Sequence, residues 1–228
     1  MRSVLFVIFA ALLGASGAAR AGERLVVVEL FTSEGCSSCP PADLYLNELA
    51  QSRRDVLPLA FHVTYWNSLG WRDPFSFEAA TQRQYGYSSH FGENSVFTPQ
   101  MIVDGSKSLI GSDRAEAENA IQAAKSAGRA AVPLAVKRDG ATLTIKLGAG
   151  TGSGRLLLVG FDHLHRTSVG RGENSGRVLT ESNIVRSARD VGAWTGAETT
   201  LRVSMPDGVD AAVLLQAEDG AITAAARL

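Results

Sequence analysis

The chain has 228 residues and carries 22 lysines and arginines against 23 aspartates and glutamates, a formal net charge of −1 at pH 7. Hydrophobic residues make up 45% of the chain, which is ordinary for a globular protein. The near-neutral charge and the lack of a large basic patch argue against nucleic acid as a partner, and the length allows one large domain or two small ones.

Residues 1–21 have the pattern of a secretory signal peptide. Arg2 gives a positive start, an apolar run follows over residues 4–13, and Ala19-Arg20-Ala21 fits a small-X-small cleavage site. The apolar run is too short for a bilayer-spanning helix, which needs about 20 residues. The sequence therefore predicts cleavage after Ala21, a periplasmic or secreted protein, and no membrane association after cleavage.

Residues 22–129 have the pattern of a layered α/β unit. The predicted elements, in chain order, are a buried strand over 25–31, a helix from residue 40, a buried strand over 56–65, a polar helix over 76–88, a strand over 96–103, a returning strand over 108–110 and a helix over 113–127. Asp104-Gly105 has the composition of a hairpin turn, and Ser112 is the predicted N-cap of the last helix. The predicted order is β-α-β-α-β-β-α.

The residue pattern of the sequence changes after residue 129. Short alternating or apolar runs are separated by turns rich in glycine, aspartate and serine, and residues 170–176 form a longer polar loop, GRGENSG. This pattern is typical of antiparallel β structure. We therefore expect an α/β domain over 22–129 and a C-terminal antiparallel β domain over 130–228.

The two cysteines of the chain stand two residues apart, as Cys36-Ser37-Ser38-Cys39. Thiol–disulfide exchange needs one thiolate that attacks and a second thiol that resolves the mixed disulfide. Because Cys36 precedes a predicted helix, free N–H groups and the partial positive charge of the helix N-terminus would favour its thiolate. The pattern predicts Cys36 as the nucleophile and Cys39 as the resolving thiol, in a site that needs no cofactor.

Two other uses of the cysteines stay open. As an inert disulfide the pair would close a loop of four residues, which stabilises by about 1.9 kcal/mol, against about 4 kcal/mol for loops of many tens of residues. As a metal site it would need a third or fourth ligand, such as His62 on the next strand, to hold a soft ion such as Cu(I). The redox dithiol is the favoured interpretation.

A Thr98-Pro99 step precedes the strand MIVDG. X-Pro bonds adopt the cis form at modest cost, and a cis bond beside the cysteines would present the Thr98 backbone to an extended substrate peptide. The alternative is a trans proline at the start of a strand. After a Cys-X-X-Cys motif, the step favours the first interpretation.

Two titratable residues lie on the predicted strands that flank the cysteines. Glu29, if buried, would have a raised pKa and would exchange a proton with Cys39; otherwise it faces solvent on an alternating strand. His62 would lower the pKa of the cysteines as a nearby cation, or it is a hydrogen-bonded core histidine. An aromatic loop over 66–75 either covers the site or packs on the core.

The residues Cys36 to Cys39, Thr98-Pro99 and Val103-Asp104-Gly105 resemble the thioredoxin superfamily. The segments VVELFTSEGCSSCPPAD, FHVTYWNSLGWRDPFS, TPQMIVDG and GENSGRVL resemble, more closely, the uncharacterised secreted thioredoxin-like family called domain of unknown function 1223. That resemblance implies a thioredoxin-like fold, export and a cofactor-free dithiol, but no substrate. The Ser37-Ser38 spacer and Gly35 depart from thioredoxin, which usually has Gly-Pro and a preceding tryptophan.

The predicted function is that of an exported thiol–disulfide oxidoreductase. Its partners would be a disulfide-containing protein or a thiol substrate, together with a redox partner. The alternative is a non-catalytic binding module of the cell envelope, in which the β domain or the 170–176 loop recognises the partner. A soft-metal carrier is a further alternative.

Overall fold

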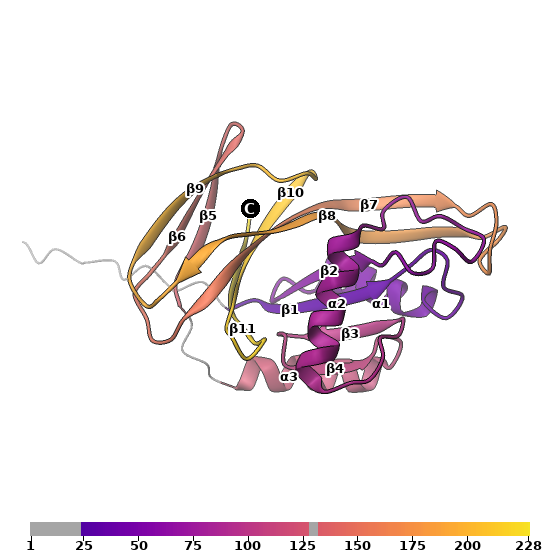
Figure 1. Cartoon of the computed structure of the whole chain (residues 1–228), viewed down its shortest axis with the longest axis horizontal. Coiled ribbons are helices and arrows are strands. Elements are labelled where there is room, and N and C mark those ends of the chain that lie inside the picture. Colours follow the sequence, from indigo (N-terminus) through magenta and orange to yellow (C-terminus); the bar gives the residue numbers. More distant parts are fainter. Residues whose placement is uncertain (1–23, 128–131) are drawn as a thin grey trace, which may run out of the picture.

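The computed structural model describes residues 24–127 and 132–228. The predicted signal peptide, 1–21, and the predicted domain boundary at residue 129 lie outside these ranges. The elements are β1 (Val26–Thr32), α1 (Pro40–Ser52), β2 (Val56–His62), α2 (Glu78–Phe91), β3 (Gln100–Val103), β4 (Lys107–Ile110), α3 (Arg114–Ser126), β5 (Leu134–Asp139), β6 (Thr142–Leu147), β7 (Gly154–Ser168), β8 (Val178–Trp194), β9 (Thr199–Ser204), β10 (Asp210–Gln216) and β11 (Ile222–Arg227) (Figure 1). None of the helices described is long and apolar enough to cross a bilayer.

The α/β part has the predicted order of elements, with ends shifted by a few residues. The polar helix predicted over 76–88 is α2, which begins at Glu78 and ends at Phe91. The N-cap of α3 is Asp113, not the predicted Ser112: the Asp113 carboxylate accepts from the Glu116 N–H at 3.0 Å. Serine and aspartate both cap helices well, so the sequence pattern alone does not decide which of the two adjacent residues is the N-cap.

The strands of the α/β part lie in the order β2-β1-β3-β4, with β1 parallel to β2 and antiparallel to β3. Every residue of β1 is buried because helices cover both faces of the sheet. Val28 and Leu30 pack against α1 and α3, whereas Val27 and Phe31 pack on the face that α2 covers. The predicted mixed α/β fold with added antiparallel strands is confirmed.

The C-terminal strands extend this same sheet, which has the order β11-β10-β7-β8-β2-β1-β3-β4. β8 joins β2 through one parallel pair, Ala60 with Ile184. Beside it the Asn183 amide donates to the Pro58 carbonyl oxygen at 2.8 Å. Because the two strands share only this one backbone pair, the Asn183 side chain supplies part of the join. The division at 129/130 stays a prediction, since the sheet is continuous across it.

A second sheet, β5-β6-β9, packs on the C-terminal strands and buries a core that includes Leu143, Ile145, Leu158 and Trp194. β7 and β8 are the longest strands of the part described, with 15 and 17 residues. Figure 1 shows that they run from this second sheet to the opposite end of the molecule. The loop that joins them is the polar loop noted in the sequence, and it reaches the cysteines.

Candidate functional site

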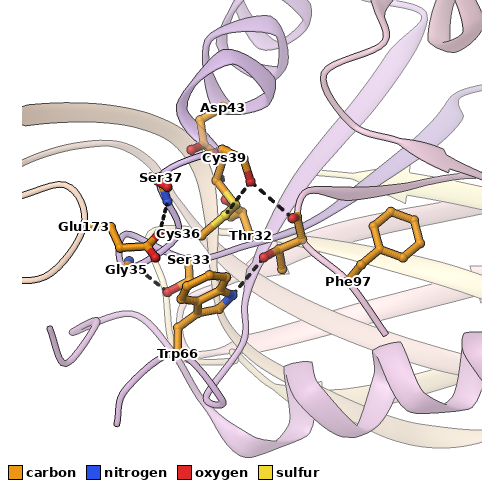
Figure 2. The surroundings of a disulfide bond; sticks show 12 residues. Thr32, Ser33, Gly35, Cys36, Ser37, Cys39, Asp43, Trp66, Phe97 and Glu173 are labelled. Atoms are coloured by element: carbon orange, nitrogen blue, oxygen red, sulfur yellow. Dashed lines mark hydrogen bonds between the residues drawn. A yellow bond between two sulfur atoms is a disulfide. The ribbon is translucent and has the colours of Figure 1, made fainter. Parts of the chain in front are cut away.

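Cys36 and Cys39 form a disulfide at the start of α1, with their Cα atoms 5.4 Å apart (Figure 2). Both residues have 0% relative exposure, whereas Ser37 and Ser38 between them are exposed. The pair follows β1 through a tight turn, in which the Cys36 N–H donates to the Ser33 carbonyl oxygen at 3.0 Å. The disulfide therefore sits where the central strand passes into its helix.

The helix N-terminus does not supply the free N–H groups expected from the sequence. Pro40 and Pro41 occupy the first helical positions and have no N–H. The Cys39 N–H donates to the Cys36 carbonyl oxygen at 3.2 Å, and the Ala42 N–H is bonded to Cys39. The polar group in contact with the sulfur is a hydroxyl: Ser38 Oγ is 3.4 Å from Cys36 Sγ. Of the two effects predicted to favour the Cys36 thiolate, free N–H groups and the helix dipole, only the dipole remains.

Thr98-Pro99 lies beside the turn that carries the cysteines, and its peptide bond is cis, as predicted. The Ser38 hydroxyl donates to the Thr98 carbonyl oxygen at 3.4 Å. The indole N–H of Trp66 donates to Thr98 Oγ1 at 2.8 Å. Trp66 also packs on Gly35, where a side chain would come within 3.2 Å of the Trp66 Cβ. Trp66 thus connects the two segments that flank the disulfide, as Figure 2 shows.

Glu29 is fully buried, so the alternative of a solvent-facing residue is wrong. Its two carboxylate oxygens bond to α2: Arg83 donates at 2.6 and 3.0 Å, and the Tyr87 hydroxyl donates at 2.5 Å. Burial, with the Glu29 charge beside it, raises the pKa of Tyr87. Glu29 therefore belongs to a buried ion pair on the α2 side of the sheet, and neither oxygen bonds to the cysteine segment.

His62 is fully buried and its Nδ1 lies 2.7 Å from Asp73 Oδ2. Its Nε2 lies 3.7 Å from Glu181 Oε1. Burial disfavours the imidazolium, but the two carboxylates outweigh it and raise the pKa of His62 to about 10. His62 is thus a core histidine whose direct partners are Asp73 and Glu181, and its effect on the cysteines stays a prediction.

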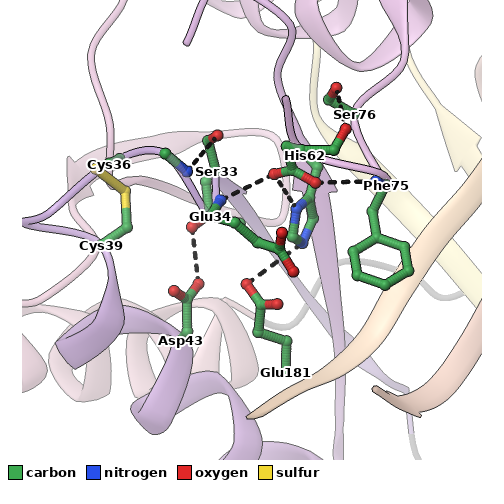
Figure 3. A network of polar contacts seen from close by, with 12 residues as sticks. Ser33, Glu34, Cys36, Cys39, Asp43, His62, Phe75, Ser76 and Glu181 are labelled. Atoms are coloured by element: carbon green, nitrogen blue, oxygen red, sulfur yellow. Dashed lines mark hydrogen bonds and ion pairs between the residues drawn. A yellow bond between two sulfur atoms is a disulfide. The ribbon is translucent and has the colours of Figure 1, made fainter. Parts of the chain in front are cut away.

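Four buried carboxyl groups surround His62: Glu34, Asp43, Asp73 and Glu181, here called the acid cluster (Figure 3). Burial raises the pKa of Asp43 to about 7 and raises the pKa of Glu34 and Glu181. Burial acts the same way on Asp73, but His62 outweighs it and lowers the pKa of Asp73. The cluster thus combines the His62–Asp73 pair with three carboxyl groups whose pKa is raised.

The bonds of the acid cluster tie it to the cysteine turn. Asp43 Oδ1 accepts from the Thr32 hydroxyl at 2.8 Å, and Asp73 Oδ2 accepts from the Glu34 N–H at 2.8 Å. The indole N–H of Trp71 donates to Glu34 Oε2 at 2.8 Å, so the aromatic loop covers this side of the site. The cluster lies directly behind the turn that carries Cys36.

Several polar atoms of the acid cluster are buried without a hydrogen-bond partner: Glu34 Oε1, Asp43 Oδ2, His62 Nε2, and Oε1 and Oε2 of Glu181. Within residues 24–127 and 132–228, no group of three or more His, Cys, Asp or Glu side chains is arranged to hold a metal ion. The metal site of Cys36, Cys39 and His62 considered from the sequence therefore has no support in this geometry.

The loop between β7 and β8 completes the site. The Asn174 side-chain amide donates to the carbonyl oxygens of Glu34 and Cys36, at 2.9 Å each. The Glu173 carboxylate accepts from the Ser37 N–H at 3.0 Å. Sequence reasoning noted this loop but gave it no place in the site. The motif GENSGRVL, which contains Glu173 and Asn174, was the sequence signal that could have indicated a role of this loop in the site.

Comparisons with known proteins agree with the motifs. The family model described as "Protein of unknown function (DUF1223)" matches residues 27–217. The crystal structure of protein AGR_C_4864 from Agrobacterium tumefaciens is 34% identical, with a TM-score of 0.77 over 91% of this chain and 96% of that one. HBP35 of Porphyromonas gingivalis shares the fold at 16% identity, with a TM-score of 0.63 over 90% of this chain and 75% of that one. No curated protein matches this chain.

Proposed function

Since the chain belongs to the DUF1223 family, whose description names no function, we propose from its geometry that it is a thiol–disulfide oxidoreductase with a thioredoxin-like site. One observation carries the proposal. A disulfide closes between Cys36 and Cys39 at the start of α1, in a turn whose Ser38 hydroxyl donates to the Thr98 carbonyl oxygen, and a buried carboxyl, Asp43, stands one helical turn away. A dithiol, a peptide-binding backbone and a proton acceptor are the parts that disulfide exchange needs.

In the direction of substrate reduction, the Cys36 thiolate attacks one sulfur of a substrate disulfide. A mixed disulfide forms, and one substrate thiolate leaves. Cys39 then loses its proton and attacks Cys36 Sγ, which releases the second substrate thiolate and restores the Cys36–Cys39 disulfide. Two electrons pass to the substrate, so a second thiol donor must reduce the pair again. Oxidation follows the same steps in reverse.

Asp43 is better placed than Glu29 to exchange the proton of Cys39. It stands four residues after Cys39, and side chains at this spacing share one side of a helix. Burial holds its pKa at about 7, which suits a group that takes and returns a proton near neutral pH. Both oxygens of Glu29 are instead bonded to α2. We therefore move the proton-exchange role from Glu29 to Asp43.

Substrate access requires movement at the site, because Cys36 and Cys39 are both fully buried. The exposed Ser37-Ser38 turn covers Cys36 on one side, through the contact of Ser38 Oγ. Trp66 bridges Gly35 and Thr98 beside it. A thiolate that attacks the Cys36–Cys39 disulfide must approach in line with the S–S bond. Either the Ser37-Ser38 turn or Trp66 therefore has to move first. The freed Thr98 backbone then pairs with the substrate chain.

The test is the reduction potential of the Cys36–Cys39 pair, measured by equilibration with glutathione buffers and alkylation of free thiols. We expect a reversible value between about −270 and −120 mV, the range of working dithiols. Cys39→Ser should trap a mixed disulfide with substrate, whereas Cys36→Ser should trap none. A potential well below about −300 mV, or a pair that never equilibrates, would overturn the proposal.

The burial of both cysteines favours a second candidate, a binding module of the cell envelope whose disulfide is inert. Loss of both thiols separates the two candidates. If a Cys36→Ser, Cys39→Ser double variant returns a deletion strain to the wild-type phenotype, the binding module is supported. We place the protein in the periplasm or outside the cell on its N-terminal pattern, and N-terminal sequencing of the protein from cell fractions tests that placement.

A further inference from the structure

A cavity of about 370 Å³ lies beside the disulfide, between α1 and the start of β8. Pro40, Asp43 and Leu44 of α1 form one wall, and residues 177–181 form the other. Pro40 directly follows Cys39, so the cavity begins at the residue next to a reacting sulfur. The exchange of electrons between thiols does not itself need such a cavity.

Two carboxyl groups line the cavity with unused hydrogen-bonding capacity. Asp43 has 5% and Glu181 has 2% relative exposure. Asp43 Oδ2 and both oxygens of Glu181 lack a hydrogen-bond partner. Figure 3 shows the two carboxyl groups next to each other, on α1 and β8. Buried acceptors are nearly always satisfied in native proteins. Glu181 Oε1 faces His62 Nε2 at 3.7 Å, so the two oxygens that point to an absent donor are Asp43 Oδ2 and Glu181 Oε2.

The chemistry of the cavity selects a cationic donor with an apolar stem. Carboxyl oxygens favour cations over anions, and a planar guanidinium pairs with carboxylates through two parallel N–H bonds. At the rim, Leu44 is 56% and Val178 is 48% exposed, which offers apolar surface to an alkyl chain. Arg177, also on the rim, is already bonded to Asn174 Oδ1 at 3.1 Å. No set of metal ligands exists among the residues that the structure describes.

We propose that this cavity binds an alkylguanidinium or alkylammonium group, carried as an arginine or lysine side chain close to the reacting cysteine of the substrate. This inference rests on the proposed function and names its substrate class: disulfides flanked by basic residues. The raised pKa values of Asp43 and Glu181 agree with it, because burial raises both and the nearby His62 offsets that effect only in part. A bound guanidinium would favour their ionised forms.

Binding is tested first without redox chemistry. A Cys36→Ser, Cys39→Ser variant is titrated with N-acetyl-arginine amide and with its neutral isostere, N-acetyl-citrulline amide, and the amide NMR signals of Leu44 and Thr180 are followed. We expect saturable shifts with the arginine probe and none with citrulline. Adding Glu181→Gln, which keeps the shape, should weaken binding at least tenfold, and Glu198→Gln on the surface should not change it.

A second binding variant avoids the buried cluster. Leu44→Lys at the exposed rim places a competing cation at the cavity and should weaken the arginine probe at least threefold. Thermal unfolding checks that each variant is folded. Equal shifts with arginine and citrulline probes, or none with either, would overturn the inference.

Specificity is tested next with the reduced wild-type protein, in single turnovers. Two peptides, each disulfide-bonded to glutathione, differ only by arginine or citrulline next to the cysteine. We expect the arginine peptide to react at least ten times faster, and Glu181→Gln to bring the ratio near one. Equal rates for the two peptides would overturn the substrate class while leaving the oxidoreductase. If neither peptide reacts but the probe still binds, the cavity stands and the proposed function fails.

Discussion

The side-chain amide of Asn174 donates to the carbonyl oxygen of Cys36 at 2.9 Å, although 138 residues separate them in the chain. The same nitrogen donates to the Glu34 carbonyl oxygen at 2.9 Å. One side chain of the β7–β8 loop thus holds both ends of the turn before the disulfide. The C-terminal strands are therefore part of the site and not only an addition to the fold.

Asn174→Asp removes both donors with almost no change of shape. It removes the Asn174 donor from the Glu34 carbonyl oxygen, leaves the Cys36 carbonyl oxygen only the Cys39 N–H, and adds a buried negative charge. We expect a loss of about 2–4 kcal/mol in the free energy of unfolding, measured by urea denaturation with the disulfide intact. Ser175→Ala, in the same loop but exposed, is the control. A change below about 0.5 kcal/mol in Asn174→Asp would mean that the loop does not hold the turn.

Glu173→Gln tests the electrostatics of the Cys36 thiolate. The Glu173 carboxylate accepts from the Ser37 N–H, and this bond lowers the pKa of Glu173, so a negative charge stands beside the site at neutral pH. Such a charge disfavours a thiolate at Cys36. Its removal should raise the reduction potential, and by less in 1 M salt than in low salt. An unchanged or lower potential would count against a functional Cys36 thiolate near this loop.

Trp66→Ala tests whether an aromatic cover limits access to the disulfide. The indole of Trp66 is held on Thr98, next to the buried pair, so its loss should speed the reduction of Cys36–Cys39 by dithiothreitol several-fold. Reduction is followed by thiol alkylation and mass measurement. Leu69→Ala, in the same loop with an exposed side chain, should react as the wild type does. Equal rates in all three proteins would assign the barrier to the Ser37-Ser38 turn.

The raised pKa of His62, about 10 against an ordinary 6.5, predicts how stability depends on pH. A group that binds its proton more tightly in the folded state stabilises fully below pH 6.5 and loses that effect as the pH rises through 10. Since one pKa unit corresponds to about 1.4 kcal/mol, the loss should be on the order of a few kcal/mol. Urea unfolding at several pH values measures it. A His62→Gln variant should have a flatter profile, and a wild-type profile flat over this window would refute the imidazolium.

Two isosteric variants, Glu29→Gln and Asp43→Asn, test which of the two carboxyls exchanges the proton of Cys39. Glu29→Gln leaves Arg83 without its buried carboxylate and should cost about 3–5 kcal/mol of stability. It should not change the pH dependence of disulfide exchange. Asp43→Asn should remove from that profile the step near pH 7. If Glu29→Gln alone moves the step, the proton acceptor is Glu29 and our reassignment is wrong.

The fold was largely predictable because its signals are local. Apolar runs, the two prolines after Cys39 and the Asp104-Gly105 turn each depend on a few neighbouring residues, and they place the α/β elements within a few positions. The join of β8 to β2 was not predictable, since it depends on one strand pair and on Asn183, which bonds to a residue 125 positions earlier.

The candidate site divides in the same way. Cys36, Cys39, Thr98 and Pro99 stand in recognisable motifs, and the structure brings them together. The acid cluster has no motif, because its members come from a turn, a helix, a loop and β8. The partners of Glu29 could not be predicted either: its strand position suggested a role at the cysteines, but its carboxylate is paired with Arg83, 54 positions later on α2.

The separation between Cys36 and Asn174 also sets an order of events during synthesis. The ribosome adds about 5–20 residues per second, so the 138 residues between them take roughly 7 to 28 seconds. Throughout that interval the nascent cysteines have no β7–β8 loop over them, and β2 has an unpaired edge that invites contact with other chains. The turn before the disulfide thus gains its Asn174 bonds only when the last third of the polypeptide is present.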